Sequence, residues 1–401
     1  MAVDSVRPPF KRPLLRLFSG RDESLKCQAP PRVSLYEELM SQRALSYLCT
    51  ASALAIICRI LPPLSRAMSG IGGVLLFLYV AHLLAQFVLF YFKKTQVDVG
   101  DKAVLITGCD TGFGNELARR LTDDGVFVYA GCLYPDGSEA KKLSEDCGSR
   151  LKVLKMDVTR ADDVDRAFRE LEHTLNGKGP KVLWGVVCNA GRSVLSEIEW
   201  CDIQTFREMI EVNVLGNVRV TKAFLPLLRK SKGRIVFVTS VAGHFTYPGF
   251  VGYSMSKHAM VSFADGLRRE MKKWGVKVIT VEPGLYRTRM TTEDAVNKGL
   301  DNNWQKTPDI VKESYGQDYF EAFRKSLLKA QQTARTNILE VIETLQEAVL
   351  VENPNYTYRC AGIKDLIRFW FMSILPTPVM DILFCLILQP NTPLESINKS
   401  V

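Results

Sequence analysis

The chain has 401 residues, 47% of them hydrophobic and 24% charged, a composition that excludes a wholly disordered chain, a collagen and a coiled-coil rod. The formal net charge of +9 comes mostly from the first 99 residues, which hold 12 Lys and Arg against 6 Asp and Glu, so we expect no nucleic-acid partner for the folded body. The 10 cysteines form no CxxC pair, and we predict reduced thiols and no metal site.

Residues 1–43 are predicted to form a disordered basic tail, because prolines stand among scattered charges throughout this segment. Its arginines and lysines also resemble a mitochondrial transit peptide. Pro8, Pro9 and Pro13 oppose the amphipathic helix that such a peptide forms.

Residues 44–94 are assigned to a membrane anchor of one or two helices. Residues 67–92 carry no formal charge and exceed the ~20 apolar residues that a bilayer core needs, which predicts a transmembrane helix. Lys93 and Lys94 follow as a basic anchor. Residues 44–58 form a shorter apolar run, which either spans the bilayer with Arg59 at the interface or lies in the membrane as a re-entrant segment.

From Lys102 onward, short β-rich runs alternate with helical patterns. This alternation predicts an α/β fold, a Rossmann-type doubly wound parallel sheet, with the catalytic domain over residues 95–330. The predicted strands cover 103–107, 126–129, 153–156, 182–187, 235–238 and 276–281, and the predicted helices cover 115–125, 161–175, 205–228 and 255–274.

A glycine-rich loop follows the first predicted strand and opens a helix, with glycines at 108, 112 and 114. Gly108 permits a tight turn, Gly112 lets the backbone approach a pyrophosphate, and Gly114 lets the helix pack closely on the strand. The phosphate charge would then meet N–H groups at the helix N-terminus. This context predicts a dinucleotide site.

The cofactor preference is read from the end of the second strand, where the adenosine ribose binds. Spacing from Gly125 places Cys132 there, with no Arg or Lys until Lys141. A 2′-phosphate would lack a neutralising cation, so we predict NAD(H) in preference to NADP(H). Asp157, at the end of the third strand, either meets the adenine or is a solvated acid at a strand end.

A candidate catalytic group follows, in which Tyr253 and Lys257 share one helix face as Tyr-x-x-x-Lys. A lysine ammonium beside a tyrosine hydroxyl stabilises the phenolate. Ser240 ends a strand thirteen residues earlier and could hydrogen-bond the substrate oxygen. Asn213 could hold a water that relays protons from the lysine.

In order and spacing these residues resemble the short-chain dehydrogenase/reductase family over 102–290. The resemblance implies that Tyr253 is the general acid/base, Lys257 lowers its pKa and binds the nicotinamide ribose, and Ser240 and Asn213 polarise the substrate and support proton relay. A departure is Cys188, where the family has an Asn. The cofactor-binding residues that the family pattern implies are Thr107, Gly108, Gly112, Phe113, Gly114, Cys132, Asp157, Asn189, Ala190, Gly191, Tyr253, Lys257, Pro283, Gly284 and Thr288.

Four segments, KAVLITGCDTGFG, FVYAGCL, FLPLLRKSKGRIV and YGQDYF, are similar to one branch of this family. It contains 17β-hydroxysteroid dehydrogenase type two, 11β-hydroxysteroid dehydrogenase type two, retinol dehydrogenases and D-3-hydroxybutyrate dehydrogenase. Membership of this branch implies NAD(H), membrane association and a C-terminal extension.

Residues 285–320 are predicted to form a lid over the substrate, and residues 331–401 a C-terminal extension that is partly membrane-associated. In the lid, Arg287 and Arg289 could grip a carboxylate or lie in solvent. Phe245, Tyr247 and Phe250 could give the substrate site apolar walls or belong to the core. Residues 369–388 either dip into a membrane or pack as a helix pair.

Together these features predict a membrane-bound NAD(H)-dependent oxidoreductase that interconverts a secondary alcohol and a ketone on a lipophilic, steroid- or retinoid-like substrate. The alternatives are a D-3-hydroxybutyrate-type dehydrogenase of mitochondria and a non-catalytic nucleotide-binding membrane scaffold. The expected location is the endoplasmic reticulum membrane with a cytosolic catalytic domain, or the mitochondrial inner membrane. A homo-oligomer built through the helices at 205–228 and 255–274 is compatible with the sequence.

Overall fold

A computed structural model describes residues 52–53, 55–56, 71–91, 95–177 and 179–388. The chain divides into two units, Met1–Lys93 and Lys94–Val401, and each is described by itself. The predicted disordered tail at 1–43 lies outside the described residues, as does nearly all of the apolar run at 44–58.

The first unit contains helix α4 (Ile71–Tyr91). Across the residues that the structure describes, no helix meets both the length and the apolarity needed to cross a membrane. The transmembrane helix predicted at 67–92 is therefore not supported by the described residues.

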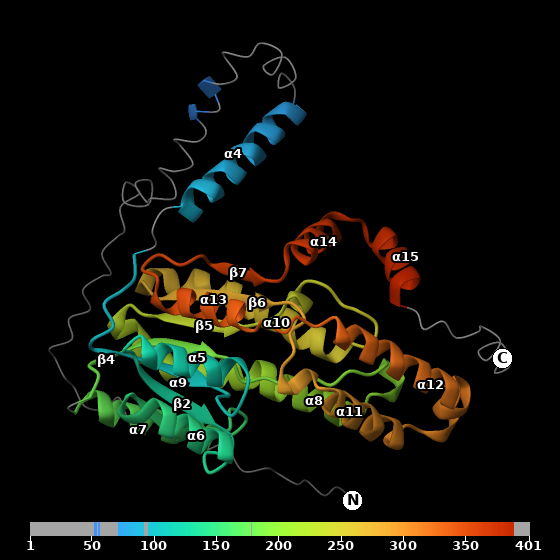
Figure 1. Ribbon diagram of the computed structural model, residues 1–401, viewed down its shortest axis with the longest axis horizontal. Helices are drawn as coiled ribbons and strands as arrows, with labels where there is room; N and C mark the ends of the chain where they lie inside the picture. The colour runs from blue at the N-terminus through green and yellow to red at the C-terminus, as the bar shows by residue number, and fades with distance from the viewer. Residues whose placement is uncertain (1–51, 54, 57–70, 92–94, 178, 389–401) are drawn as a thin grey trace, which may run out of the picture. The chain divides into compact units, whose positions relative to one another are not determined.

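The second unit is built on a seven-stranded sheet with the order β3-β2-β1-β4-β5-β6-β7, in which every neighbouring pair is parallel (Figure 1). The central strands are nearly continuous apolar runs buried on both faces, as parallel strands covered by helices must be. The predicted doubly wound parallel sheet is confirmed. Its strands are β1 (Lys102–Thr107), β2 (Phe127–Cys132), β3 (Leu151–Lys155), β4 (Val182–Cys188), β5 (Arg234–Val238), β6 (Lys277–Pro283) and β7 (Thr357–Cys360).

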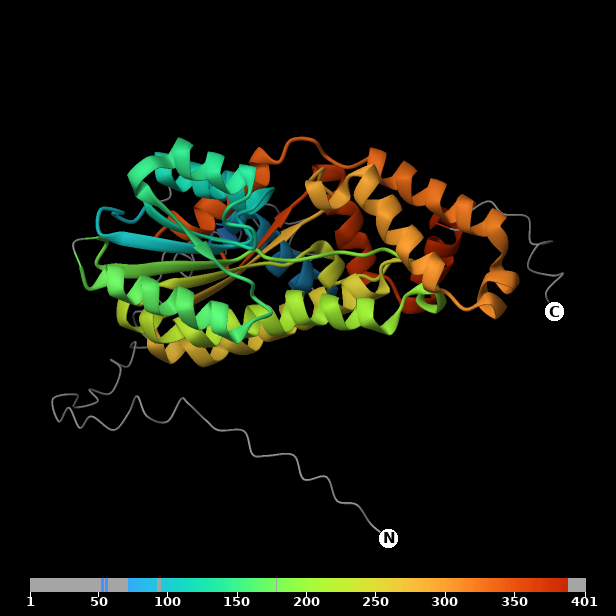
Figure 2. The same cartoon turned by 90° about the horizontal axis from the view of Figure 1, so that it is seen from below.

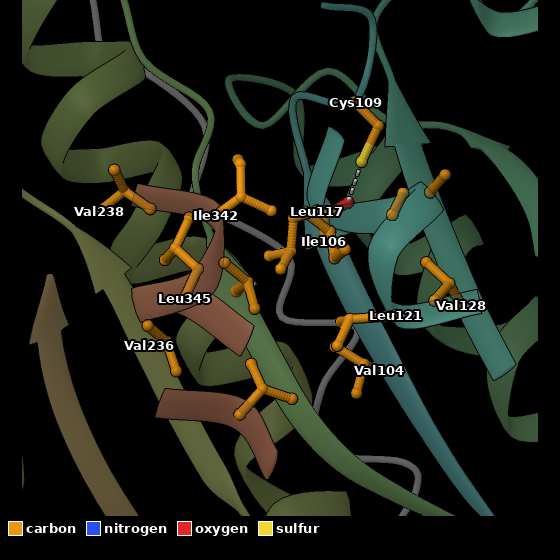
Figure 3. Close-up of a cluster of buried hydrophobic side chains, with 14 of the residues drawn as sticks. Val104, Ile106, Cys109, Leu117, Leu121, Val128, Val236, Val238, Ile342 and Leu345 are labelled. Atoms are coloured by element: carbon orange, nitrogen blue, oxygen red, sulfur yellow. Dashed lines mark hydrogen bonds between the residues drawn. The ribbon is translucent and has the colours of Figure 1, made fainter. Parts of the chain in front are cut away.

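Helices cover both faces of the sheet (Figure 2). One face carries a core built with α5 (Phe113–Asp123), α6 (Ser138–Cys147) and α13 (Leu339–Leu350). Figure 3 shows Ile342 and Leu345 of α13 beside Val236 and Val238 of β5. The other face carries a core built with α7 (Ala161–Leu175), α9 (Asn217–Ser231) and α10 (Val251–Met271).

The single helix predicted at 205–228 is instead three segments. α8 (Ile203–Ile210) leads into a π-helical turn, Glu211–Gly216, and α9 follows. At the end of this turn the backbone packs closely on the loop after β3, because a Cβ on Gly216 would lie 2.7 Å from Val158 Cγ2. Such turns often occur at functional sites, and this one carries Asn213.

The predicted lid after β6 is mostly helical. α11 (Glu293–Lys306) and α12 (Asp309–Gln332) occupy the predicted lid and continue beyond it, with a kink in α12 at Gly316. Residues 369–388 lie in two helices, α14 (Ile363–Ile374) and α15 (Thr377–Leu388). They are separated at Leu375, whose extended backbone is the conformation favoured before a proline, here Pro376.

The buried Arg234 ties α13 to the sheet. Its Nη1 donates hydrogen bonds to the carbonyl oxygens of Ala348 (3.1 Å) and Val351 (2.6 Å), and its guanidinium lies 4.5 Å from the centre of the Trp184 ring. Carbonyls in the last turn of a helix have no partner within the helix, and a cation there is favourable. Burial lowers the pKa of Arg234 to about 10, so the group remains a cation at neutral pH.

We therefore expect Arg234→Ala to lower the free energy of unfolding by about 3 kcal/mol, because two charge-assisted hydrogen bonds are lost and two buried carbonyls are left unpaired. Urea unfolding of the purified full chain, followed by circular dichroism, measures this change. The control is Arg229→Ala, which removes an exposed guanidinium 4.7 Å from the Trp274 ring and should cost less than about 1 kcal/mol. Equal effects of the two variants would contradict the anchoring role.

Candidate active site

One large cavity, of about 1380 Å³, opens at the carboxyl ends of the strands. Its lining comes from the glycine-rich loop, the turns after β4, β5 and β6, the start of α10, the lid helices α11 and α12, and helices α14 and α15. Open parallel sheets bind their ligands at this edge, where the strand order reverses. Here the reversal falls between β1 and β4.

The glycine-rich loop forms a cradle that fits a pyrophosphate. Gly108 and Gly112 have φ values of 72° and 69°, which residues other than glycine rarely adopt. A Cβ on Gly114 would lie 2.5 Å from Asn189 Nδ2 and from Gly108 O, so only glycine allows the helix this close. Around Gly112 a Cβ would have no described atom within 4 Å. The N-terminus of α5 therefore faces open space in which an anion can bind.

The turn after β4 is locked onto this loop by Thr107 and Asn189. Thr107 Oγ1 accepts hydrogen bonds from the backbone N–H groups of Asn189 and Ala190, both at 3.0 Å. Asn189 Nδ2 donates to the carbonyl oxygens of Thr107 (2.9 Å) and Gly108 (3.0 Å). Asn189, Ala190 and Gly191 line the cavity, whereas Thr107, which is fully buried, holds them in place from behind.

Ser240, Tyr253 and Lys257 meet in the cavity as predicted. Lys257 Nζ lies 5.6 Å from the centre of the Tyr253 ring and donates to Val238 O at 2.9 Å. Ser240 Oγ donates to Pro283 O at 3.3 Å and accepts from the N–H of Ala242 at 3.2 Å. This group can hold and move a proton at the tyrosine oxygen.

Burial sets the protonation of this pair. Burial raises the pKa of Tyr253, and a hydrogen bond with the Ser240 side chain lowers it. Burial also lowers the pKa of Lys257 to about 8. The lysine is therefore still mostly a cation at neutral pH, and its charge favours the phenolate of Tyr253.

Asn213 lies beside the cavity and not in its lining. Its Oδ1 accepts from the N–H of Arg192 at 2.8 Å, and its Nδ2 donates to Arg192 O and to Ser256 Oγ, both at 2.9 Å. The side chain thus clamps the turn after β4 to helix α10, which carries Tyr253 and Lys257. Its part in a proton relay stays a prediction.

Two residues predicted to read the adenosine lie elsewhere. Cys132 is fully buried in the sheet core, where burial raises its pKa to about 12. Asp157 Oδ1 accepts hydrogen bonds from the N–H (2.9 Å) and the hydroxyl (2.7 Å) of Thr159, which closes a local turn. Neither side chain lines the cavity. Of the other predicted cofactor residues, Phe113, Pro283, Gly284 and Thr288 do line it.

Asp110 is an acid at the cavity that sequence reasoning missed. Its two carboxylate oxygens accept the backbone N–H groups of Leu133 (2.9 Å) and Tyr134 (2.8 Å), directly after β2. The carboxylate therefore comes from the glycine-rich loop and stands at the end of the second strand, next to the position that the sequence assigned to Cys132. The sequence signal that could have identified it is the presence of an Asp inside the Gly-x-x-x-Gly segment.

Some of the remaining candidates line the cavity and others do not. Tyr247 and Phe250 line the cavity, while Phe245 stacks on Phe369 of α14 with ring centres 5.9 Å apart. Arg289 lines the cavity and Arg287 does not. At the departure from the family pattern, Cys188 is buried and its pKa is raised to about 12, so it serves as an inert core residue.

Comparison with known proteins agrees with this geometry. The short chain dehydrogenase family profile matches residues 102–298. The chain is 38% identical over 310 residues to 17-beta-hydroxysteroid dehydrogenase type 6 of Bos taurus, covering 76% of this chain and 96% of that protein. It is 37% identical to retinol dehydrogenase 16 of Rattus norvegicus, covering 74% and 92%, and 36% identical to mitochondrial D-beta-hydroxybutyrate dehydrogenase of Bos taurus, covering 71% and 83%.

Solved structures share the fold. A short chain dehydrogenase/reductase from Burkholderia phymatum in complex with NAD superposes with a TM-score of 0.56 at 18% identity, covering 74% of this chain and 99% of that one. A short chain dehydrogenase from Burkholderia cenocepacia in complex with NADP superposes with a TM-score of 0.51 at 21% identity, covering 70% and 100%.

Burial of Lys257 makes a prediction for stability. Its pKa falls from 10.5 to about 8 on folding, so the folded chain binds this proton more weakly than the unfolded chain. The resulting penalty is complete below pH 8 and is relieved as the pH rises toward 10.5. The native chain should therefore gain stability relative to Lys257→Met between pH 8 and pH 10.

Urea unfolding of the cofactor-free chain at pH 7, 8.5 and 10 measures this gain. Lys298→Met removes an exposed lysine and should differ from the native chain by the same amount at every pH. A Lys257→Met difference that does not change with pH would mean that this lysine does not titrate as the fold requires.

Proposed function

Since the chain belongs to the short-chain dehydrogenase/reductase family, whose members act on CH–OH groups, we propose that it is an NAD(H)-dependent oxidoreductase of lipophilic secondary alcohols and ketones. The observation that carries this proposal is that Ser240, Tyr253 and Lys257 meet in a cavity whose other walls are largely apolar. The relatives named for steroid and retinol substrates support the lipophilic class.

The geometry supports a proton-transfer role for the tyrosine. In the oxidation direction, the Tyr253 phenolate takes the proton of the substrate hydroxyl, and the Lys257 ammonium stabilises that phenolate. Ser240 Oγ turns from Pro283 O to donate a hydrogen bond to the substrate oxygen. In the reduction direction, Tyr253 returns the proton. A nicotinamide cofactor, when bound along the glycine-rich loop, accepts or supplies the hydride.

The cavity walls support a lipophilic substrate over a small hydroxy acid. Val296, Phe323 and Leu327 from the lid helices and Phe369 and Phe384 from the C-terminal helices line it. Arg287, the first candidate for gripping a carboxylate, lies outside the lining, and Arg289 lines the cavity but is largely exposed to solvent. A 3-hydroxybutyrate-type activity therefore has less support, although a hydroxybutyrate dehydrogenase is among the relatives.

Membrane association is part of the proposal. It is supported by apolar side chains that α14 and α15 leave exposed, among them Ile363 (71%) and Ile382 (62%). A lipophilic substrate partitions into bilayers, so a C-terminal extension that contacts the lipid would bring the cavity to the substrate. Location in the endoplasmic reticulum membrane stays a prediction.

The NAD preference is proposed on Asp110. Its carboxylate stands at the end of β2, on the cavity lining, where the adenosine ribose would bind. A negative charge at this point favours a ribose hydroxyl and repels a 2′-phosphate.

We expect Tyr253→Phe to lower kcat by about 10²–10⁴, the usual contribution of a general acid or base, and to leave NADH affinity nearly unchanged. Turnover is followed by NADH absorbance with hydroxysteroids and retinols, and NADH binding by fluorescence. The control is Tyr129→Phe, a buried tyrosine of β2 outside the cavity lining, which should keep full turnover. Native-like turnover by Tyr253→Phe would overturn the catalytic assignment.

We expect Asp110→Asn to reduce the ratio of kcat/KM with NAD to that with NADP by about five- to tenfold, the effect of one partly solvated charge near a phosphate. Asn keeps one acceptor oxygen, so one of the two hydrogen bonds to the backbone after β2 is retained and the other is lost. Asp136→Asn, an exposed acid of the next segment, should leave the ratio unchanged. An unaltered ratio in Asp110→Asn would remove the basis for the NAD preference.

A further inference from the structure

A carboxylate lies in the cavity wall beside lid helix α12. Glu197 follows the turn after β4, and the N–H of Ser196 beside it donates to Gly249 O at 2.9 Å, which fixes this stretch of backbone. The Tyr319 hydroxyl of α12 donates to Glu197 Oε1 at 3.1 Å. Both residues line the cavity.

The surroundings of this pair are aromatic and apolar. The Trp200 ring lies 5.8 Å from the Tyr319 ring, edge to face, and Phe320 and Phe323 belong to the same buried cluster. Burial raises the pKa of Glu197. Tyr319 is the one hydrogen-bond partner shown for this carboxylate among the described residues, which leaves Oε2 to the cavity. Glu197 is half-buried, so a substrate hydroxyl that reaches Oε2 would form a charge-assisted hydrogen bond there.

A second pair of the same kind lies next to the first and does not line the cavity. The Tyr315 hydroxyl donates to Glu199 at 2.5 Å, and this pair is exposed. Glu199 and Tyr315 are absent from the cavity lining. The two glutamates are two residues apart, and the two tyrosines are four residues apart on either side of the kink at Gly316. Comparing variants of the two pairs therefore shows what a position in the cavity lining adds.

We propose that Glu197, oriented by Tyr319, accepts a hydrogen bond from a second hydroxyl group of the substrate, at the end remote from the reacting carbon. The inference rests on the proposed function and narrows its substrate class. A polycyclic alcohol with a hydroxyl at each end, such as a steroid diol, meets both ends of the cavity. A retinoid presents a hydrocarbon ring to Glu197, and a hydroxy acid presents a carboxylate that the like charge repels.

The position of Glu197 agrees with a remote contact. Ser240 and Tyr253 stand at the carboxyl end of β5 and the start of α10, whereas Tyr319 belongs to α12, which lies with α11 beyond the sheet edge (Figure 1). A ligand that touches both therefore passes the apolar side chains that line the cavity, among them Phe250 and Phe323.

The test measures calorimetric binding of androstane-3,17-diol, androstan-3-ol and androstan-17-ol to the full chain saturated with NADH. The native chain should bind the diol at least about tenfold more tightly than either mono-ol, because a hydrogen bond to a charged acceptor contributes that much. Glu197→Met should lose this preference while its mono-ol affinities change less than twofold. Glu199→Met is the matched control and should keep the preference. Tyr319→Phe removes the hydroxyl that orients the Glu197 carboxylate and should weaken the preference without abolishing it.

Two results overturn the inference: a native chain without preference for the diol, or a preference that Glu199→Met removes as completely as Glu197→Met. Turnover of the same three alcohols, measured separately by NADH absorbance, tests the proposed function. Turnover of the mono-ols without a diol preference would sink the inference and leave the function standing. A diol preference that depends on Glu197, without turnover of any alcohol, would support the inference and contradict the proposed function.

Discussion

The close approach of two turns, the glycine-rich loop after β1 and the Asn189-Ala190-Gly191 turn after β4, is the constraint on which the site depends. A single Cβ at Gly114 would occupy the space of Asn189 Nδ2. Because Asn189 and Thr107 exchange hydrogen bonds across this contact, the cofactor cradle is fixed to the turn that leads to the substrate cavity. Asn213 continues the connection by clamping Arg192 to Ser256, three residues after Tyr253. A continuous set of short contacts thus joins the cradle to the catalytic tyrosine.

The C-terminal segment beyond residue 330 belongs to both the core and the cavity. Through α13, held by Arg234, it completes the hydrophobic layer on one face of the sheet, and through β7 it extends the sheet past β6. Helices α14 and α15 then line the cavity with Phe369 and Phe384. The boundary predicted near residue 330 therefore separates sequence patterns more than it separates structural parts.

The motifs made the fold and the meeting of Ser240, Tyr253 and Lys257 in one cavity predictable, because strand–turn–helix context and Tyr-x-x-x-Lys spacing are local properties. The sequence did not correctly predict the direction in which individual side chains point. Cys132 shares its parity along β2 with Val128 and Ala130, and period-two alternation sends all three into one core. Asp110 and Glu197 were missed for another reason, since their roles arise from contacts with segments far along the chain. The helical lid was missed because α11 and α12 are polar on average and show little periodicity.

The π-helical turn at Glu211–Gly216 has a consequence for how this region tolerates change. A widened turn holds one residue more than an α-helical turn, which shifts the angular phase of everything after it by about 100°. The face that α8 buries through Met209 and the face that α9 buries through Val220 and Phe224 are therefore in phase only because that residue is present. Removing one residue from 211–216 would restore a regular helix and rotate the apolar stripe of α9 away from the sheet. In this stretch the length of the chain is constrained more tightly than the identity of most of its side chains.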